Sequence, residues 1–299
     1  MAKLKEIITF LNEQVDGYIG DIQQNIIGIG ALNKATEGEI AFCRYTDERS
    51  ISLLQKAKSV IIAHSVFSLK ADQLAGKTVI FTKNPREAFI KVATQFFPPP
   101  RKSGIHPSAL MGQQCKIGSN VYLGRNTTLG DNVVIGDDTI IYDGVHIYDN
   151  VVIGANCIIH AGAVIGADGF GYERSETGQM LKFPHYASVR IGDNVEIGAN
   201  TCIDRGTLSD TVIENRVKID NLCHIAHNTL IGEDSVIIAL SLVGGSTRIG
   251  KRSWVAPCAC LKNGITIGEE AFIGLGAVVL KDVPDKVKVV GVPAKPFLL

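Results

Sequence analysis

Apolar residues recur at every sixth position over most of the chain, starting at Ile105. The residue that follows is usually glycine, as in the hexads IGSNVY, LGRNTT and LGDNVV. The phase is interrupted after Ile165 and again after Ile203, and it then runs unbroken from Ile213 to Val279. A repeat this short is typical of solenoids built from hexapeptides.

The hexads predict a mainly β fold, a left-handed parallel β-helix. The apolar residue of each unit points into a narrow axis, and the fifth residue, small or β-branched as in Val133 and Ala163, fills the space beside it. Gly, Asn and Asp supply the left-handed backbone angles that a corner requires. Three hexads complete one triangular coil, so that residues 18 positions apart stack about 4.8 Å from one another.

Two segments do not follow the repeat. Residues 170–188, FGYERSETGQMLKFPHYAS, are expected to leave the coil as a loop at one corner. A shorter interruption lies near residues 207–210, TLSD. Loops on one edge of a solenoid commonly carry binding, so both segments mark a candidate functional edge.

The first hundred residues have a different pattern. They begin with an amphipathic helical segment, and apolar runs at 59–63 and 78–81 predict strands. Pro85 opens a helix predicted over 85–97, and PPP at 98–100 is a stiff spacer. The apolar face of the first helix consists of Leu4, Ile7, Ile8 and Leu11. The predicted domains are an α/β unit at 1–100, the β-helix at 101–285 and a C-terminal tail at 286–299.

Charge and cysteine content narrow the possible functions. Lys+Arg and Asp+Glu are equal at 30 each, so no charge field favours nucleic acid or an anionic membrane. Glu6 interrupts any apolar signal segment, and no apolar run approaches the ~20 residues of a membrane helix. Seven scattered cysteines without a CxxC pair indicate reduced thiols in a cytoplasmic protein and predict no metal site.

The stretch IDNLCHIAHN at 219–228 changes the chemistry of the repeat. His227 is third in its hexad, and Gly245 follows 18 residues later, so Gly245 is predicted directly above it. Asp220 lies in the preceding hexad, around one corner. An aspartate near an imidazole can orient it and raise its basicity, and a backbone N–H can receive an oxyanion. The pattern predicts acyl transfer to an amine or an alcohol.

The remaining histidines are assigned no catalytic role. His224 is interpreted as structural, and His160 as a residue that could line a groove. Cys223, fifth in its hexad, is expected to point inward and not to act as a nucleophile. The histidines interpreted as solvated surface residues are His64, His106, His146 and His185.

Several ordered motifs closely resemble the UDP-3-O-acylglucosamine N-acyltransferases of lipid A biosynthesis. They are ADGFGY at 167–172 followed by Lys182 and Pro184, IGDNVEIGANTCIDRGTLSDT at 191–211, and KIDNLCHIAHN at 218–228. GEIAF at 38–42 and KSVIIA at 58–63 look like the uridine-binding domain of that family. The resemblance covers most of the chain to about residue 250.

The resemblance implies a homotrimer with active sites between adjacent β-helices. An acyl group would pass from an acyl carrier protein thioester to the amine of a UDP-sugar, with no bound cofactor. His227 matches the catalytic base, Asp220 its orienting acid and Gly245 the oxyanion glycine. The residues then expected to bind substrate are Phe42 (stacked on uracil), Tyr45, Phe170, Tyr172 and Asn221.

Three departures from the family keep other hypotheses open. The family tyrosine six residues after Phe42 is Glu48 here, with Tyr45 as a substitute, and a second family histidine aligns with Gly264. The ending at 273–296 is similar to coenzyme A-dependent sugar acetyltransferases. The second hypothesis is therefore acyl transfer from acyl-coenzyme A to another UDP- or dTDP-amino sugar for surface polysaccharide. The third is a non-catalytic β-helix scaffold.

Overall fold

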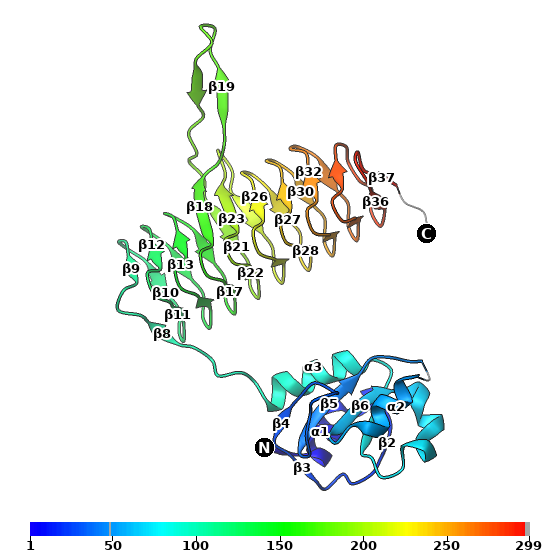
Figure 1. The fold of residues 1–299 in the computed structure, drawn as a ribbon. Helices are drawn as coiled ribbons and strands as arrows, with labels where there is room; N and C mark the ends of the chain where they lie inside the picture. Colours follow the sequence, from blue (N-terminus) through cyan, green and yellow to red (C-terminus); the bar gives the residue numbers. More distant parts are fainter. Residues whose placement is uncertain (48, 297–299) are drawn as a thin grey trace. The chain divides into compact units, whose positions relative to one another are not determined.

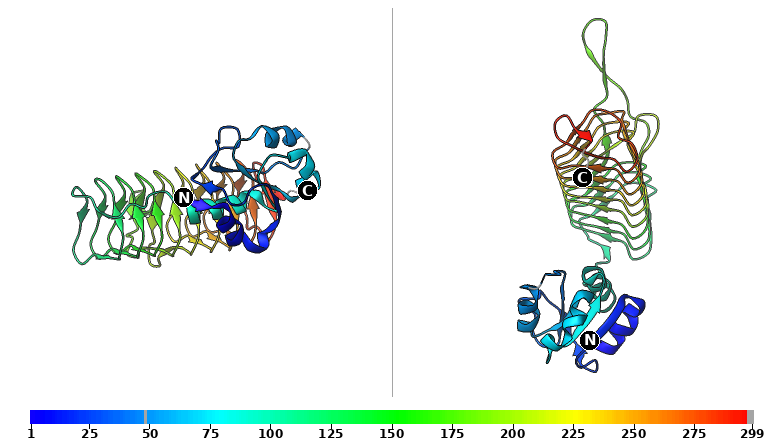
Figure 2. Two further views of the ribbon diagram at one scale, coloured as in Figure 1. Left: turned by 90° about the horizontal axis from the view of Figure 1, so that it is seen from below. Right: turned by 90° about the vertical axis from the view of Figure 1, so that its right-hand side faces the viewer.

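The hexads form a left-handed parallel β-helix, seen along its length in Figure 1 and from two further directions in Figure 2. The computed structural model describes residues 1–47 and 49–296. It divides into two compact units, Met1–Arg101 and Lys102–Leu299. The three faces of the β-helix are sheets of eight, eleven and nine strands.

Each face is a parallel stack of short strands, except that β37 is antiparallel to β36. The first face consists of β10 (Lys116–Ile117), β13 (Val134–Ile135), β16 (Val152–Ile153), β21 (Val189–Ile191), β24 (Thr211–Ile213), β27 (Leu230–Ile231), β30 (Arg248–Ile249) and β33 (Thr266–Ile267). The second consists of β8 (Gly104–Ile105), β11 (Tyr122–Leu123), β14 (Ile140–Ile141), β17 (Ile158–Ile159), β22 (Glu196–Ile197), β25 (Lys218–Ile219), β28 (Val236–Ile237), β31 (Trp254–Val255), β34 (Phe272–Ile273), β36 (Lys288–Val290) and β37 (Lys295–Pro296). The third consists of β9 (Leu110–Met111), β12 (Thr128–Leu129), β15 (His146–Ile147), β18 (Val164–Asp168), β23 (Cys202–Arg205), β26 (His224–Ile225), β29 (Leu242–Val243), β32 (Cys260–Leu261) and β35 (Val278–Val279).

Register and packing follow the hexad. Ile219 pairs with Ile237, and Ile237 with Val255, so residues 18 apart stack as predicted. The apolar residues form one continuous buried core, and fifth-position residues such as Val133 and Ala163 are fully buried beside them. Burial of each large aliphatic side chain contributes about 1.5–3 kcal/mol, and this row of contacts stabilises the coils.

Two positions of each hexad favour particular residues, one because of its backbone angle and one because of the space around it. The fourth residue of a hexad has the left-handed angles, as at Asn120 with φ 57°. The prediction that Gly, Asn and Asp fill these sites is incomplete, because Leu222 and Leu240 are also left-handed. The glycine after the apolar residue is needed for space instead. A Cβ on Gly198 would collide with the backbone of Asp220 in the next coil.

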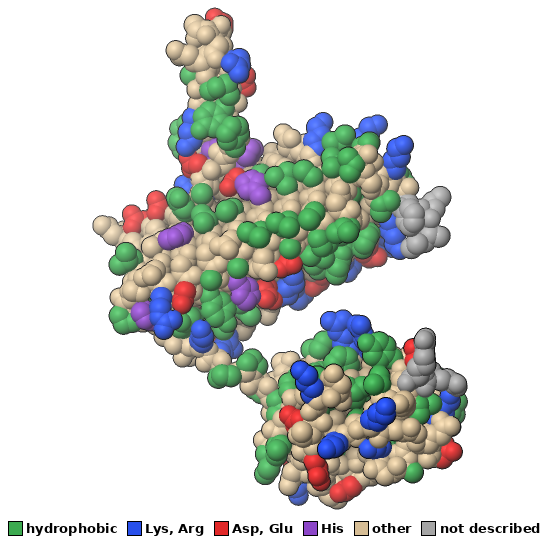
Figure 3. Space-filling model, in the orientation of Figure 1, with side chains coloured by type: hydrophobic (Ala, Val, Ile, Leu, Met, Phe, Trp, Pro, Cys, Tyr) green, Lys and Arg blue, Asp and Glu red, His purple; other side chains and the backbone are tan. Residues whose placement is uncertain are grey.

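The long interruption leaves the coil, as predicted, and it forms a hairpin of β19 (Tyr172–Arg174) and β20 (Met180–Lys182). Figure 1 shows it projecting from the β-helix, and Figure 3 shows apolar side chains along it and histidines near its base.

The segment predicted as a C-terminal tail contains strands of the β-helix. β36 pairs in parallel with β34, and β37 returns antiparallel to β36, so the second face continues to Pro296. Residues 297–299 lie outside the described chain.

The N-terminal unit is a five-stranded sheet with helices on both faces. The strand order is β2 (Val15–Ile19), β7 (Val79–Thr82), β6 (Val60–His64), β5 (Glu39–Cys43) and β4 (Gly28–Ile29). The helices are α1 (Leu4–Leu11), α2 (Arg49–Lys56), α3 (Pro85–Phe96) and the 3-10 segments η1 (Asn12–Gln14) and η2 (Ser65–Leu74). A two-stranded pair joins β1 (Ala2–Lys3) to β3 (Asn25–Ile26).

Strand alternation explains this layering. Ile62 and Ile80 face α1 and α3, whereas Ile61 and Phe81 face the opposite side with Leu54 of α2. The predicted strands and the two predicted helices are present, and the side chain of Asn84 caps α3. No helix of the described residues is long and apolar enough to cross a membrane.

Candidate active site

His227 lies just after β26, with its ring between two bare glycine backbones. A Cβ built on Gly245 would lie 2.8 Å from its Nε2, and one built on Gly169 would lie 2.9 Å from its Cδ2. Gly245 therefore lies against the imidazole, one coil away. Within the described chain the Gly245 amide N–H meets no acceptor, while its carbonyl accepts from the Gly264 N–H at 2.9 Å. The Gly245 N–H is therefore free to donate a hydrogen bond close to Nε2 of His227.

The side chain of Asn228 fixes the tautomer of His227. Its Oδ1 lies 2.8 Å from Nδ1 of His227 and also accepts from the amide and the hydroxyl of Thr207. Its Nδ2 donates to the carbonyl and hydroxyl oxygens of Ser209, which fixes the orientation of the amide. An amide oxygen only accepts, so Nδ1 carries the proton and Nε2 has a free lone pair. The short interruption at 207–210 thus holds the Asn228 amide that orients the His227 imidazole.

The structure does not bring Asp220 to His227 within one chain. Asp220 follows β25 on the second face, and its carboxylate accepts from the amides of Asn221 and Ala239. Asn228, the next residue in the chain, occupies the position beside Nδ1. A hexad is one side of the triangle, so a residue in the preceding hexad faces another direction.

Asp220 and Asn221 line a separate groove of about 590 Å³ on the second face. His160 lines it too, and its Nε2 lies 3.0 Å from Oε1 of Glu196 while its ring stacks on Tyr142. The interpretation of His160 as a groove residue agrees with this position, and the structure adds its two partners. Asn221 uses its Oδ1 to accept from the Ala199 amide at 2.6 Å.

A hollow of about 370 Å³ contains His227. Asp204 and His224 lie in it, and the carboxylate of Asp204 is 3.5 Å from Nε2 of His224. Burial raises the pKa of Asp204, and the His224 and His227 imidazoles oppose that rise. Apolar side chains line the side toward the C-terminus, namely Leu242, Cys260, Val278 and Leu280. The hollow therefore has a polar end and an apolar side.

Of the loop residues expected at the site, Phe170 lines the hollow and Tyr172 contacts Phe170. Phe170 is 84% exposed, and its ring lies 4.9 Å from that of Tyr172. Lys182 pairs with Asp168 at the base of the hairpin and lowers the pKa of that carboxyl. These contacts hold the hairpin base beside the His227 hollow.

The interpretation of His185 as a solvated surface residue is wrong. It is 7% exposed and its ring lies edge-on to that of His227, with centroids 5.5 Å apart. Its Nδ1 donates to the carbonyl of Phe183 at 3.0 Å, and its Nε2 is buried without a hydrogen-bond partner among the described residues. Burial lowers the pKa of His185. The chain returns from the hairpin over the coil and brings this residue to the site.

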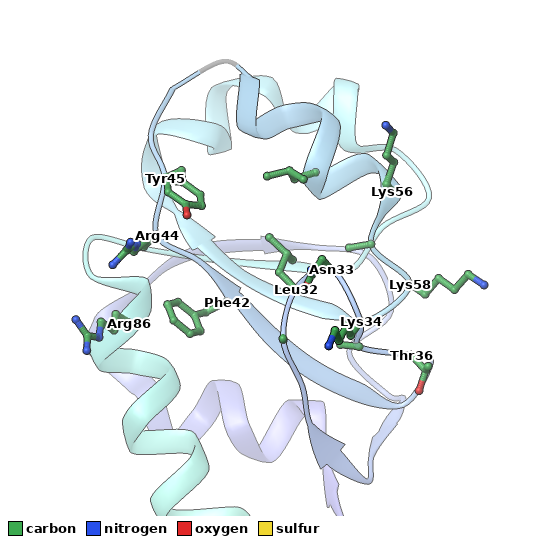
Figure 4. Close-up of a pocket in the computed structure, with 14 residues that line it drawn as sticks. Leu32, Asn33, Lys34, Thr36, Phe42, Arg44, Tyr45, Lys56, Lys58 and Arg86 are labelled. Atoms are coloured by element: carbon green, nitrogen blue, oxygen red, sulfur yellow. The ribbon is translucent and has the colours of Figure 1, made fainter.

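The N-terminal unit contains a pocket of about 920 Å³. Phe42, Tyr45 and Arg86 lie along one side of it in Figure 4. The Phe42 ring packs at 4.8 Å against that of Phe89. The cations that line it are Lys34, Arg44, Lys56, Lys58 and Arg86, and no carboxylate does so among the described residues. Glu48 lies outside the described residues.

Sequence reasoning missed Asn228, Asp204, Gly169 and His185. Asp204 had a detectable signal, since it stands where most hexads have glycine after the apolar residue. The position of Gly169 depends on the hairpin base and had none. Over the part of the chain that the structure describes, no group of three or more His, Cys, Asp or Glu could hold a metal ion.

The fold is a left-handed β-helix of hexads, and its site has a histidine base of fixed tautomer beside a free amide. Together they define a hexapeptide-repeat acyltransferase. Two family models agree with this class. Residues 132–167 match the bacterial transferase hexapeptide (six repeats), and residues 188–221 match the hexapeptide repeat of succinyl-transferase.

Curated relatives identify the family within that class. A UDP-3-O-acylglucosamine N-acyltransferase of Delftia acidovorans is 38% identical, covering 93% of this chain and 82% of the relative. The enzyme of that name from Coxiella burnetii is 37% identical over 92% and 84%, and that from Burkholderia multivorans 43% over 76% and 71%. The chain belongs to the UDP-3-O-acylglucosamine N-acyltransferase family.

Solved structures support the fold. LpxA from Acinetobacter baumannii is 26% identical with a TM-score of 0.58, covering 64% of this chain and 73% of that one. A UDP-N-acetylglucosamine acyltransferase from Campylobacter jejuni, at 22% identity and TM-score 0.59, covers 66% and 75% and shows the fold alone.

Proposed function

We propose that this protein transfers an acyl group from a thioester to the amine of UDP-3-O-acylglucosamine, a step of lipid A biosynthesis. The observation that carries the proposal is the His227 imidazole, whose free Nε2 lies against Gly245 while Asn228 holds its Nδ1 proton. Family membership supplies the acceptor, because the relatives are named for it.

The chemistry needs one base and one oxyanion donor. Nε2 of His227 takes a proton from the amine as its nitrogen attacks the thioester carbon. The Gly245 N–H donates to the oxyanion of the tetrahedral intermediate. The C–S bond then breaks, and the proton on His227 passes to the leaving sulfur. The products are an amide and a thiol, and no bound cofactor enters the reaction.

We assign the nucleotide to the N-terminal unit. Phe42 would stack on the uracil, and Tyr45 would stand on the second side in place of the family tyrosine. Five cations without a lining carboxylate suit a diphosphate. This assignment is supported by the chemistry of the pocket and by the resemblance of GEIAF to a uridine-binding motif.

We propose a homotrimer in which the acceptor lies between neighbouring β-helices. Asp220 and Asn221 line a groove separate from the His227 hollow of the same chain. They would then contact the sugar nucleotide held by a neighbouring copy. Phe170 and Tyr172 would cover its opening. We place the reaction in the cytoplasm, where the seven free cysteines would stay reduced.

The donor is proposed to be an acyl carrier protein, with acyl-coenzyme A as the alternative. The test is a donor–acceptor matrix read by mass spectrometry, with the wild type and His227→Ala side by side. Each donor is offered with UDP-3-O-acylglucosamine and with a panel of UDP- and dTDP-amino sugars. The proposal expects transfer from the carrier to UDP-3-O-acylglucosamine, reduced about 10²–10⁴-fold by His227→Ala. Transfer only from coenzyme A to another sugar would establish the alternative, and none at all would favour a scaffold.

A further inference from the structure

Asp204 presents an under-paired carboxylate to the reaction site. It is the third residue of β23, and Ile203 pairs with Ile225, so Asp204 lies beside Ala226 and one residue from His227. It is 7% exposed, yet it lines the hollow that contains His227. Its one ion pair in the described chain is the 3.5 Å contact with His224, which is long for a charge-assisted hydrogen bond.

The neighbouring cations are committed elsewhere. Arg205, the next residue, donates its Nε to the carbonyl of Gly166 and a terminal nitrogen to that of Asp149. Lys182 pairs with Asp168. Lys262 lines the same hollow, but it stands two coils beyond Ala226 in the register of the third face. Among the described residues no lysine or arginine pairs with Asp204, and its ionic partner is the imidazole of His224 at 3.5 Å.

A buried carboxylate without full pairing is costly, so a cationic ligand that completes its pairing would stabilise the site. The part of the ligand that contacts Asp204 must be small and cationic, and it must donate hydrogen bonds. It must also lie next to His227. We infer that Asp204, with His224, forms an ammonium subsite that holds the amino group of the acceptor and selects an amine over a hydroxyl nucleophile. The inference rests on the proposed function and adds to it the residue that chooses the nucleophile.

The proton balance can be met through this subsite. An amine beside an acetal carbon is partly protonated near neutral pH, and only its neutral form attacks. The ammonium first loses one proton through Asp204 and His224 to water. The neutral nitrogen then forms the C–N bond, His227 takes the second proton, and the leaving sulfur receives it. The net change is an ammonium and a thioester converted to an amide, a thiol and one proton.

A hydroxyl acceptor gains less from this arrangement. It carries no charge for Asp204 to pair with, and burying a carboxylate against a neutral donor recovers less of its lost hydration. The site is therefore matched to an amino sugar. The groups that face Asp204 are His224 and His227 from the β26 side and Asp168 from β18. Protonation of either imidazole would compete with the ammonium for the carboxylate.

The test compares two ligands on one variant, Asp204→Asn. Calorimetry would measure binding of UDP-3-O-acylglucosamine and of its analogue with a hydroxyl in place of the amine. The variant is expected to bind the amine about 10- to 100-fold more weakly, and the hydroxyl analogue within about three-fold of the wild type. The difference should shrink as the pH rises above the pKa of the amine. Asp234→Asn, the same change at an exposed corner where Asp234 pairs with Arg216, is the control and should alter neither.

Normal binding of the hydroxyl analogue also shows that Asp204→Asn is folded, and Asp204→Glu should restore part of the preference. Equal weakening of both ligands, or no weakening of the amine, would overturn the ammonium subsite alone. If the wild type binds neither ligand and transfers no acyl group, the proposed function itself fails, and the subsite with it.

Discussion

The Oδ1 atom of Asn228 lies 2.8 Å from Nδ1 of His227, and the rest of the Asn228 amide is bound to the 207–210 loop. The neutral amide fixes the proton on Nδ1 without adding charge to the imidazole. A carboxylate at the same place would fix the same tautomer and also stabilise the imidazolium. The identity of this neighbour therefore tunes the basicity of His227.

Replacing Asn228 by Asp should move the acid limb of the kcat–pH profile to higher pH by about one unit. The new carboxylate raises the pKa of His227, so that a higher pH is needed to free Nε2. Asn228→Ala should lower kcat about ten-fold without that displacement, because the tautomer is no longer fixed. Asn132→Asp, at another left-handed corner, is the control. An unshifted profile in Asn228→Asp would contradict this role.

Adding a methyl group at Gly245 should disrupt the base while leaving the β-helix folded. A Cβ there would lie 2.8 Å from Nε2 and Cε1 of His227, closer than side chains pack, so the ring must move. We expect Gly245→Ala to lower kcat by about 10²-fold or more, as loss of an aligned catalytic group does. Gly17→Ala is the control, because a Cβ there would meet no atom within 4 Å and the backbone has no left-handed angle. Wild-type kcat in Gly245→Ala would remove this glycine from the mechanism.

Nucleotide affinity should depend on Phe42. Base–aromatic stacking is worth about 1–3 kcal/mol, so Phe42→Ala should weaken UDP binding by about 10- to 100-fold in calorimetry. Tyr45→Ala should also weaken UDP binding, because Tyr45 is proposed to cover the second side of the uracil. Phe10→Ala, which removes a partly exposed ring packed on Phe96, is the control. Unchanged UDP affinity in Phe42→Ala would place the base elsewhere.

The β-helix could be predicted in detail because apolar residues recur every six positions, and three such repeats make one coil. The site could be predicted only where that spacing continues. Gly245 is 18 residues from His227 and lies against it. Stepping back by the same 18 residues from Ala226 gives Leu208, but the four extra residues of the second interruption shift the true neighbour to Asp204.

Asp220 is close to His227 in sequence but lies on another face of the same chain, because a corner of the coil separates the two residues. His185 could not be placed from the sequence at all. It follows a hairpin whose length and return path are set by tertiary contacts, such as the bonds from the amides of Tyr186 and Ala187 to the carbonyl of Thr207. Hexad arithmetic describes the scaffold, and the inserted segments decide which groups meet at the base.

His185 should make the protein less stable in acid. Burial lowers its pKa, so the folded protein holds it neutral, while the unfolded chain binds a proton near pH 6.5. The stability it contributes is present above that pH and is lost as the pH falls below it. His185→Gln keeps a polar group of similar reach but does not titrate, so its unfolding free energy should fall less steeply between about pH 6.5 and 5. Denaturant titrations at several pH values, with His146→Gln as an exposed control, check this. Parallel pH slopes for the wild type and His185→Gln would show that the buried imidazole is not the titrating group.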